Sequence, residues 1–267
     1  MLTKNFTLNK KSISLLSTRG LPLPLLKSQI DESIDFFLEL TFAQGLEIIR
    51  KKGLYYFKTK FIPIEDVEFC IVDIEANGSN LDKHQIIEIA AVKVKNGKII
   101  DKYDSLVFTK EINPIIVELT GISASDTVDA PELKTVMMEF KLFLGDAIFV
   151  AHDVKFDYNY ISGSMQKIGL EPLLNRSLCS LAFAERTIVS YKYSLAYLNK
   201  TFNFNPDATH HRAMSDVMTT YGLFLKSLEN CTESLNNVED LIKFSKEAKR
   251  LKRPKFDPFL EEETESK

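Results

Sequence analysis

The chain has 267 residues, of which 45% are hydrophobic and 27% are charged, and its formal net charge is −3. This apolar fraction is that of an ordinary globular protein and excludes a wholly disordered chain, and no run approaches the roughly 18 consecutive apolar residues that span a bilayer. The three widely spaced cysteines, Cys70, Cys179 and Cys231, exclude a disulfide framework and a four-thiolate zinc site. Because no apolar segment follows the first charged residues, we expect a cytoplasmic protein without a secretory signal or a membrane partner.

The charges are distributed unevenly along the chain. Residues 1–64 carry a balance of +5, residues 241–256 of +6 and residues 257–267 of −4, which leaves −10 for residues 65–240. An acidic centre between basic flanks is typical of a protein that gathers carboxylates around cations while its flanks contact a polyanion. A solvated surface without a partner explains the same charges equally well.

The first 64 residues are expected to form a small module of their own. The prolines within residues 21–25 disfavour a helix there. Helices are predicted at residues 31–40, with Asp31 as the N-cap, and at residues 46–52, ending at Gly53. Residues 54–61, rich in tyrosine and phenylalanine, are predicted to be a strand. We therefore expect residues 1–64 to be a mainly helical, winged-helix-like module with a β element.

The pattern changes from residue 68 onward. Strands are predicted at residues 69–74, 86–94, 99–108 and 147–151, with a hairpin turn at Asn96-Gly97. Helices are predicted at residues 131–144, 156–168, 181–187, 194–202 and 212–228. Three successive strands followed by alternating helices and strands predict an α/β domain over residues 65–230, with helices on both faces of a mixed sheet. Residues 231–267 are expected to be a charged C-terminal extension.

Asp73 and Glu75 are the first candidates for chemistry. Strand side chains alternate, so Phe69, Ile71, Asp73 and Glu75 are expected on one face of the strand. Two carboxylates at the end of an apolar strand need cations or a proton if they are buried, because like charges repel. Two solvated acids at a strand end are the ordinary alternative for this spacing alone.

Two further segments supply acids and a histidine. Asp157 follows the apolar run 147–151, where a buried strand gives way to a helix, and it faces the same edge as Asp73 if the strands are parallel. In His211-Arg-Ala-Met-Ser-Asp216, five residues correspond to about 500° of helix, so the two side chains cannot share one helical face. We therefore place His211 in the loop before the helix or in its first turn, and Asp216 within the helix. His84 and His210 are interpreted as ordinary surface histidines.

The four acids and the histidine together match a two-metal site. Mg²⁺ prefers oxygen ligands and keeps several waters, so about four carboxylates can hold two ions. Two ions roughly 3.5–4 Å apart stabilise the attacking and the leaving oxygens of a phosphodiester displacement. A histidine with a pKa near neutrality can accept the proton of the attacking water.

The ordered set Asp73-x-Glu75, Phe156-Asp157 and His211-x-x-x-x-Asp216 resembles the DEDDh (DnaQ-like) branch of the DEDD 3′–5′ exonucleases. In pattern it is most similar to the epsilon proofreading subunits of bacterial DNA polymerase III. The resemblance covers roughly residues 66–230. It includes the linking segments 87–92, 119–122, 150–152, 194–195 and 210–225.

The resemblance implies an RNase H-like fold with a mixed five-stranded sheet, and hydrolysis of nucleic acid from the 3′ end to nucleoside monophosphates. It assigns two Mg²⁺ or Mn²⁺ ions to Asp73, Glu75, Asp157 and Asp216, and the role of general base to His211. It also assigns contacts with the terminal nucleotide to a second set: Ala76, Asn77, Gly78, Thr120 and Phe156.

Two positions depart from the family pattern. Ala76-Asn77-Gly78 stands where the family usually has a threonine-rich run, so contacts to the 3′ hydroxyl would fall to Asn77 or to backbone groups. Asp153 stands where the family commonly has asparagine, and we expect its side chain to point away from the metals or to be paired.

The favoured function is a metal-dependent 3′–5′ exonuclease acting on single-stranded or frayed DNA ends, as the proofreading partner of a replicative polymerase. An exoribonuclease that trims RNA ends uses the same chemistry. A non-catalytic protein that binds nucleic acid or a polymerase is the alternative of another class. Residues 244–259 are expected either to bind a partner or to be a disordered charged terminus.

Overall fold

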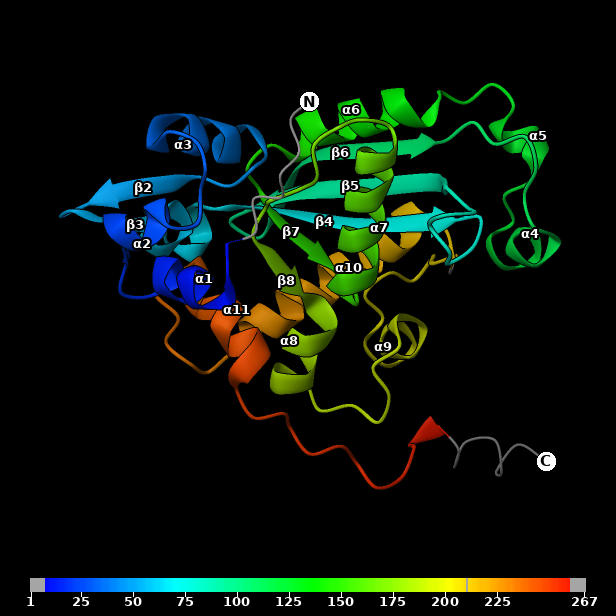
Figure 1. Cartoon of the computed structure of the whole chain (residues 1–267). Coiled ribbons are helices and arrows are strands. Elements are labelled where there is room, and N and C mark those ends of the chain that lie inside the picture. Colours follow the sequence, from blue (N-terminus) through cyan, green and yellow to red (C-terminus); the bar gives the residue numbers. More distant parts are fainter. Residues whose placement is uncertain (1–7, 210, 260–267) are drawn as a thin grey trace.

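The computed structural model describes residues 8–209 and 211–259 (Figure 1). His210 lies outside the described residues, as do positions 1–7 and 260–267. None of the helices in the described part of the chain has both the length and the apolar character needed to cross a membrane.

The N-terminal unit combines three helices with a three-stranded antiparallel sheet of order β1-β3-β2. Its elements are α1 (Lys10–Ser17), β1 (Leu21–Pro22), α2 (Leu23–Lys27), α3 (Ile34–Ala43), β2 (Ile48–Lys51) and β3 (Leu54–Phe57). Two short 3₁₀ turns, Lys58–Phe61 and Ile64–Asp66, lead into the next unit. Buried leucines and the rings of Phe37 and Phe57 form its core.

Three predictions for this unit are wrong in detail. Residues 46–52 are not a helix: Ile48–Lys51 pairs with β3, and Gly53 is a hairpin turn residue with positive φ, not a helix end. Residues 23–27 are helical because Pro24 lies in the first turn, where its missing N–H breaks no hydrogen bond. The N-cap of α3 is Ser33, whose hydroxyl accepts a hydrogen bond from the Phe36 backbone, and not Asp31.

A mixed five-stranded sheet of order β6-β5-β4-β7-β8 forms the centre of the molecule (Figure 1). Its strands are β4 (Glu68–Ala76), β5 (Ile86–Lys95), β6 (Lys98–Leu106), β7 (Ile148–Ala151) and β8 (Ser177–Cys179). β4, β5 and β6 are antiparallel, with Asn96 and Gly97 in the predicted hairpin turn, whereas β7 and β8 run parallel to β4. The predicted α/β, RNase H-like fold class is confirmed; β8 is too short to have been recognised as a strand.

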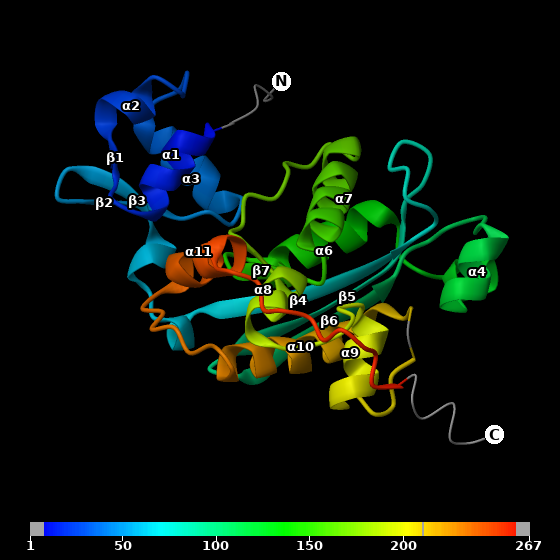
Figure 2. The same ribbon diagram turned by 90° about the horizontal axis from the view of Figure 1, so that it is seen from below.

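Alternation along β4 divides the core into two layers. Cys70, Val72 and Ile74 pack under α6 (Leu133–Leu144) and α7 (Val154–Lys167). Phe69 and Ile71 pack under the opposite helices. Figure 2 shows α10 on that side of the sheet. The helices of this second side are α8 (Ser180–Thr187), α9 (Leu195–Phe202), α10 (Ala213–Glu229) and α11 (Val238–Glu247). Two short helices beyond the sheet, α4 (Pro114–Thr120) and α5 (Ala124–Thr127), complete the fold.

The described part of the C-terminal extension is folded onto the domain. α11 buries Val238, Leu241 and Ile242 in the same core layer as α10. The extended segment after α11 lies against α8 and α9, where Arg253 pairs with Glu185 at 2.9 Å. The alternative of a disordered terminus is therefore wrong for residues 244–259.

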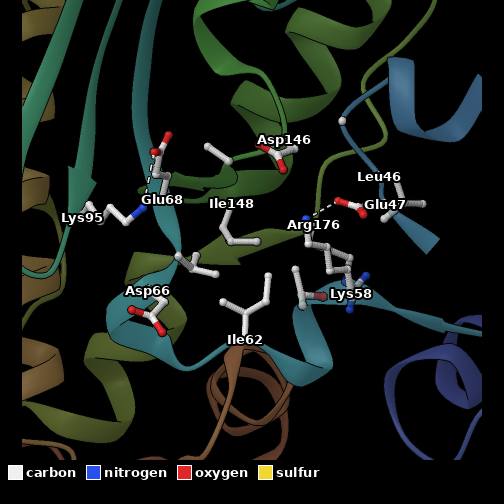
Figure 3. A pocket seen from close by; sticks show the side chains of 14 residues that line it. Leu46, Glu47, Lys58, Ile62, Asp66, Glu68, Lys95, Asp146, Ile148 and Arg176 are labelled. Atoms are coloured by element: carbon white, nitrogen blue, oxygen red, sulfur yellow. Dashed lines mark hydrogen bonds and ion pairs between the residues drawn. The ribbon is translucent and has the colours of Figure 1, made fainter. Parts of the chain in front are cut away.

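A charged pocket of about 200 Å³ lies where the N-terminal unit meets the start of β4 (Figure 3). Lys58 pairs with Glu47 at its wall, and Lys95 pairs with Glu68. Glu68 and Glu75 are separated by seven strand positions, roughly 23 Å. The pocket therefore lies at the opposite end of β4 from the predicted acids.

Candidate active site

Asp73 and Glu75 project from the C-terminal half of β4. They lie on the same face of β4 as Phe69 and Ile71, which are buried under α10. The alternation of strand side chains predicts this shared face. A register shift in the pairing of β4 with β5 occurs directly after Glu75. The strand therefore ends its regular pairing at the acids, where both side chains are partly exposed.

Asp157 reaches the same edge of the sheet from a neighbouring strand. β7 is parallel to β4, so the two strands end on the same side, and α7 begins directly after the two-residue turn that follows β7. Asp157 lies in the first turn of α7 and is only 4% exposed. A hydrogen bond from the Ile74 backbone reaches its carboxylate, which ties it to β4.

His211 and Asp216 have the arrangement that their spacing predicts. His211 precedes α10, in a left-handed conformation with φ of 61°, and Asp216 lies in the first turn of the helix. The backbone N–H of His211 donates a hydrogen bond of 3.1 Å to Asp216 Oδ2. The loop and the helix are thus coupled, and the imidazole is left exposed.

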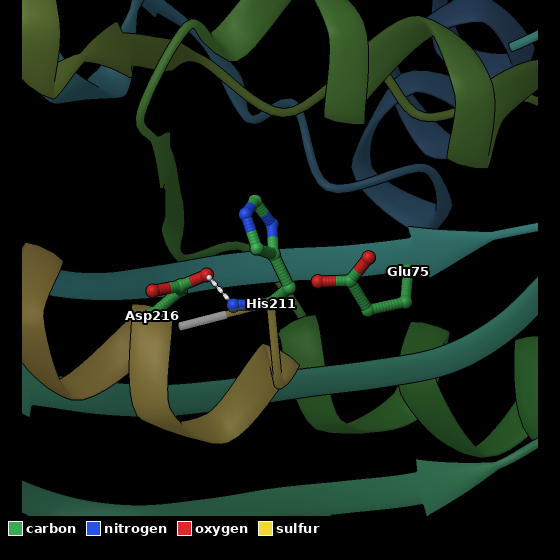
Figure 4. A group of neighbouring side chains, drawn as sticks. All are labelled: Glu75, His211 and Asp216. Carbon is green, nitrogen blue, oxygen red and sulfur yellow. Dashed lines mark hydrogen bonds between the residues drawn. The ribbon is translucent and has the colours of Figure 1, made fainter. Parts of the chain in front are cut away.

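Residues from β4 and from the segment 211–216 meet at one point (Figure 4). Ligand atoms of Glu75, His211 and Asp216 all lie within 4.8 Å of one another. Asp73 belongs to the same group, since the charges of Asp157 and Asp216 both act on it. Residues separated by more than 130 positions in the chain therefore meet at the end of β4.

Burial and the repulsion of neighbouring charges raise the pKa values of Asp73, Glu75 and Asp157. Burial, followed by the charges of Asp157 and Asp216, holds the pKa of Asp73 well above its usual range. Burial and the nearby Asp216 raise the pKa of Glu75 to about 8. Burial raises the pKa of Asp157 to about 7. Such a cluster is stable at neutral pH with bound protons or with cations, and its carboxylate oxygens are donors that suit Mg²⁺ or Mn²⁺.

A buried ion pair that the sequence reasoning missed supports the histidine loop. Glu88 lies opposite Glu75 in the β4–β5 register and is 2% exposed. Its carboxylate receives hydrogen bonds from the Arg212 guanidinium, the shortest 2.9 Å, and from the backbone N–H of Ala213 at 2.8 Å. Glu88 therefore accepts a hydrogen bond from a backbone N–H at the N-terminus of α10, and it fixes Arg212, the residue next to His211. The sequence does contain a signal for this ion pair. Glu88 is an acid within the apolar run of residues 86–92, and a buried carboxylate needs a partner.

Asn77 and Gly78 form the turn that follows β4 and its last residue, Ala76. The Asn77 amide donates to the Glu111 carbonyl and accepts from the Asn113 backbone, so its side chain holds the loop before α4. Gly78 has a φ of 142°, and a Cβ there would lie 2.7 Å from the His84 ring. The Asn77 amide is therefore engaged within the protein, and backbone groups are what the turn offers to a ligand.

Thr120 and Phe156 differ in their availability to a ligand. Thr120 is buried at the end of α4, where its hydroxyl donates to the Ile116 carbonyl and accepts from the Ile122 backbone. The ring of Phe156 is 44% exposed beside Asp157, and its inner side contacts Tyr160 at 5.5 Å between ring centres. The ring of Phe156 is therefore accessible from outside the protein, whereas Thr120 shapes the helix end.

Asp153 is exposed at the N-cap of α7, and its side chain makes no capping hydrogen bond. Its φ of 66° lies in the left-handed region, which asparagine and aspartate tolerate better than other side chains. The preceding His152 is fixed by hydrogen bonds to the Tyr193 carbonyl and to Ser180. The backbone explains why a residue of the Asn/Asp type stands here.

Comparisons with known proteins agree with this geometry. A family model described as Exonuclease (RNase_T) matches residues 70–224. A DNA polymerase III of the PolC type from Staphylococcus aureus is 35% identical over 179 residues, which are 66% of this chain and 12% of the relative. The chain thus spans about an eighth of the length of the curated relatives it matches.

Two solved structures share the fold. Exonuclease X in complex with 5′ overhanging duplex DNA superposes with a TM-score of 0.53 and 26% identity, covering 66% of this chain and 99% of that one. A zinc-bound complex of E. coli exonuclease I with single-stranded DNA has a TM-score of 0.56 and 16% identity, covering 62% and 41%. The second likeness shows the fold alone.

Proposed function

The chain belongs to the DEDD-type 3′–5′ exonuclease family, and we propose that it hydrolyses DNA from the 3′ end with two divalent cations. The observation that carries the proposal is the convergence of four carboxylates and one exposed imidazole at the end of β4. These are the groups that a metal-dependent phosphodiester hydrolysis requires.

Asp73, Glu75, Asp157 and Asp216 would hold the two ions. The ions, when bound, supply Lewis-acid stabilisation of the attacking and leaving oxygens. The exposed His211 side chain accepts the proton of the attacking water, and its backbone bond to Asp216 keeps it beside the acids. The exposed face of Phe156 packs against the terminal base, next to Asp157.

The substrate and the partner are proposed from the relatives. The PolC-type relatives are DNA polymerases, and exonuclease X binds duplex DNA with an overhang. These similarities support DNA as the substrate and a replicative polymerase as the partner, in a proofreading role. No feature of the described residues favours RNA.

The test is hydrolysis of a 3′-labelled DNA oligonucleotide with and without Mg²⁺ or Mn²⁺. Asp73→Asn should abolish release of nucleoside monophosphates without unfolding the protein, and His211→Ala should slow it by about 10²–10⁴-fold. The matched control is Asp101→Asn, an exposed acid on β6, which should leave the rate unchanged. Full activity of Asp73→Asn in a clean preparation would refute the proposal.

The same assay separates the finer alternatives. A matched RNA oligonucleotide hydrolysed faster than DNA would replace the DNA assignment by an exoribonuclease. Faster removal of a mismatched than of a paired 3′ nucleotide is expected of a proofreading enzyme. Failure of the wild-type protein to bind Mn²⁺ in a calorimetric titration would instead indicate a non-catalytic member of the family.

A further inference from the structure

The N-terminal unit has the element order and strand pairing of a winged helix. Along residues 10–57 a helix, a strand, two helices and two strands follow one another, and the last strand lies between the other two. We propose that this unit is a winged-helix module that binds the phosphate backbone of duplex DNA through its β2–β3 hairpin, here called the wing. This contact is separate from the exonuclease site and goes beyond the proposed function.

The tip of the wing concentrates positive charge. Arg50, Lys51 and Lys52 are consecutive and all exposed. Lys52 and Gly53 both have positive φ, 49° and 81°, as a tight two-residue hairpin turn requires. The three cations therefore lie at the end of β2 and in the tight turn that follows it, and not in an irregular loop.

Within the described part of the chain, these cations have no carboxylate partners. Over residues 8–209 and 211–259, no acid forms an ion pair with any of the three, whereas Lys58 at the base of the wing pairs with Glu47. Lys51 lies over the Phe61 ring at 4.1 Å and Arg50 over the Tyr55 ring at 6.0 Å. Aromatic contacts hold the side chains in place and leave their N–H donors available for phosphate oxygens.

The helix that would enter a DNA groove, α3, carries negative charge, in contrast to the positive wing. In a helix-turn-helix the second helix of the pair reads the major groove, and α3 has that place in this unit. α3 carries exposed Asp35 and Glu39, and Asp31 and Glu32 precede it. Its exposed apolar side chains include Phe42, which is 56% exposed. Like charges repel α3 from phosphates, which leaves the wing as the DNA-binding element.

Binding through the wing alone is independent of sequence. Contacts to phosphates position a protein on DNA but carry no information about the bases. The wing belongs to the unit at the start of β4, and the acids lie at the end of that strand (Figure 1). The wing and the exonuclease site would therefore contact different parts of a DNA molecule.

The test uses a closed dumbbell duplex, which has no 3′ end, with a chelator present, so that binding does not depend on the exonuclease site. Anisotropy is measured over a range of salt concentrations for the full chain. Each phosphate contact contributes about 0.9 to the slope of log K against log salt. The triple variant R50Q/K51Q/K52Q should therefore reduce the slope by about 2 to 3. The matched control is K95Q/K98Q/K102Q, which removes the same charge around the β5–β6 hairpin.

A lower slope for the wing variant, with the control equal to the wild type, is the expected result. The proposal would be overturned by equal slopes for both variants or by a wild-type protein that does not bind the dumbbell. It would also be overturned if the wing variant showed the same reduction of slope on a single-stranded circle. The three single variants, each expected to reduce the slope by about 0.9, provide the answer if the triple variant does not fold. Hydrolysis of a short single strand should be unchanged in the wing variant, which separates this result from a failure of the exonuclease assignment.

Discussion

Arg212 connects the fold to the charge of the candidate site. Its guanidinium pairs with the buried Glu88, and its positive charge lowers the pKa of Glu75, opposing the effect of burial. Metal ions compete with protons for carboxylates. Arg212→Ala should therefore raise the pKa of Glu75 further, and the acidic limb of the pH–rate profile should move to higher pH.

The measurement is the rate of hydrolysis at saturating DNA over the range from pH 5 to pH 9. A loss of about 10–100-fold near neutral pH is expected, as for other supports of metal ligands. Arg212→Lys, which keeps the charge but not the paired hydrogen bonds, should restore the position of the acidic limb. An unmoved limb in Arg212→Ala would limit Arg212 to a purely structural role.

Substitutions of Asp153 test whether this position requires an aspartate for its backbone conformation or for its charge. Asp153→Asn should leave hydrolysis within about twofold, because both residues tolerate the left-handed conformation and the side chain is exposed. Asp153→Ala should lower the free energy of unfolding by about 1–2 kcal/mol, which is the cost of that conformation for an ordinary residue. Denaturant unfolding and the exonuclease assay measure the two effects. A large gain of activity in Asp153→Asn would show that the extra charge inhibits the metal site.

At the scale of elements, a buried carboxylate joins three parts of the chain. Glu239 of α11 pairs with Arg176 through two hydrogen bonds of 2.8 and 2.6 Å, and Thr59 donates to it from the end of the N-terminal unit. The Arg176 guanidinium also lies 4.4 Å from the centre of the Phe57 ring. This cluster fixes the N-terminal unit and α11 to the end of the sheet at β8.

Removal of Glu239 should therefore destabilise the protein without changing its chemistry. The Glu239 side chain is 2% exposed, and loss of one partner from a buried pair costs about 3–5 kcal/mol. Glu239→Ala should show this loss in denaturant unfolding, with the rate of hydrolysis unchanged at a temperature where it is folded. Glu229→Ala, which breaks an exposed pair with Lys226, is the control and should cost less than about 1 kcal/mol.

The elements also show how far the sequence alone could be interpreted. Strict alternation in residues 69–75 predicts both core layers and the shared face of Asp73 and Glu75, since a strand allows no other arrangement. Residues 46–52 fit a helical and a strand pattern equally well, and only pairing with β3 decides between them. The partner of Glu88 is 124 positions away, so the sequence shows that a partner is needed but not which one.

At the scale of the whole molecule, the acid cluster opposes folding when no metal is bound. The raised pKa values of Glu75, about 8, and Asp157, about 7, mean that the folded state holds protons that the unfolded state releases near pH 4. Stability falls with rising pH wherever the folded state binds more protons. The metal-free protein should therefore become less stable as the pH rises from about 4 to about 8.

Thermal unfolding in a chelator at pH 6 and pH 8 measures this effect. The melting temperature should be lower at pH 8 by at least about 2–4 °C, the shift that about 1 kcal/mol produces in a domain of this size. Saturating Mn²⁺ should remove the difference, because the cations neutralise the carboxylates that repel one another. Asp157→Asn should be more stable than the wild type in chelator at pH 8 and should gain less from Mn²⁺. The opposite result has two parts: the melting temperature of the metal-free protein rises between pH 6 and pH 8, and Asp157→Asn does not change it. This result would show that the acids do not repel one another at the end of β4.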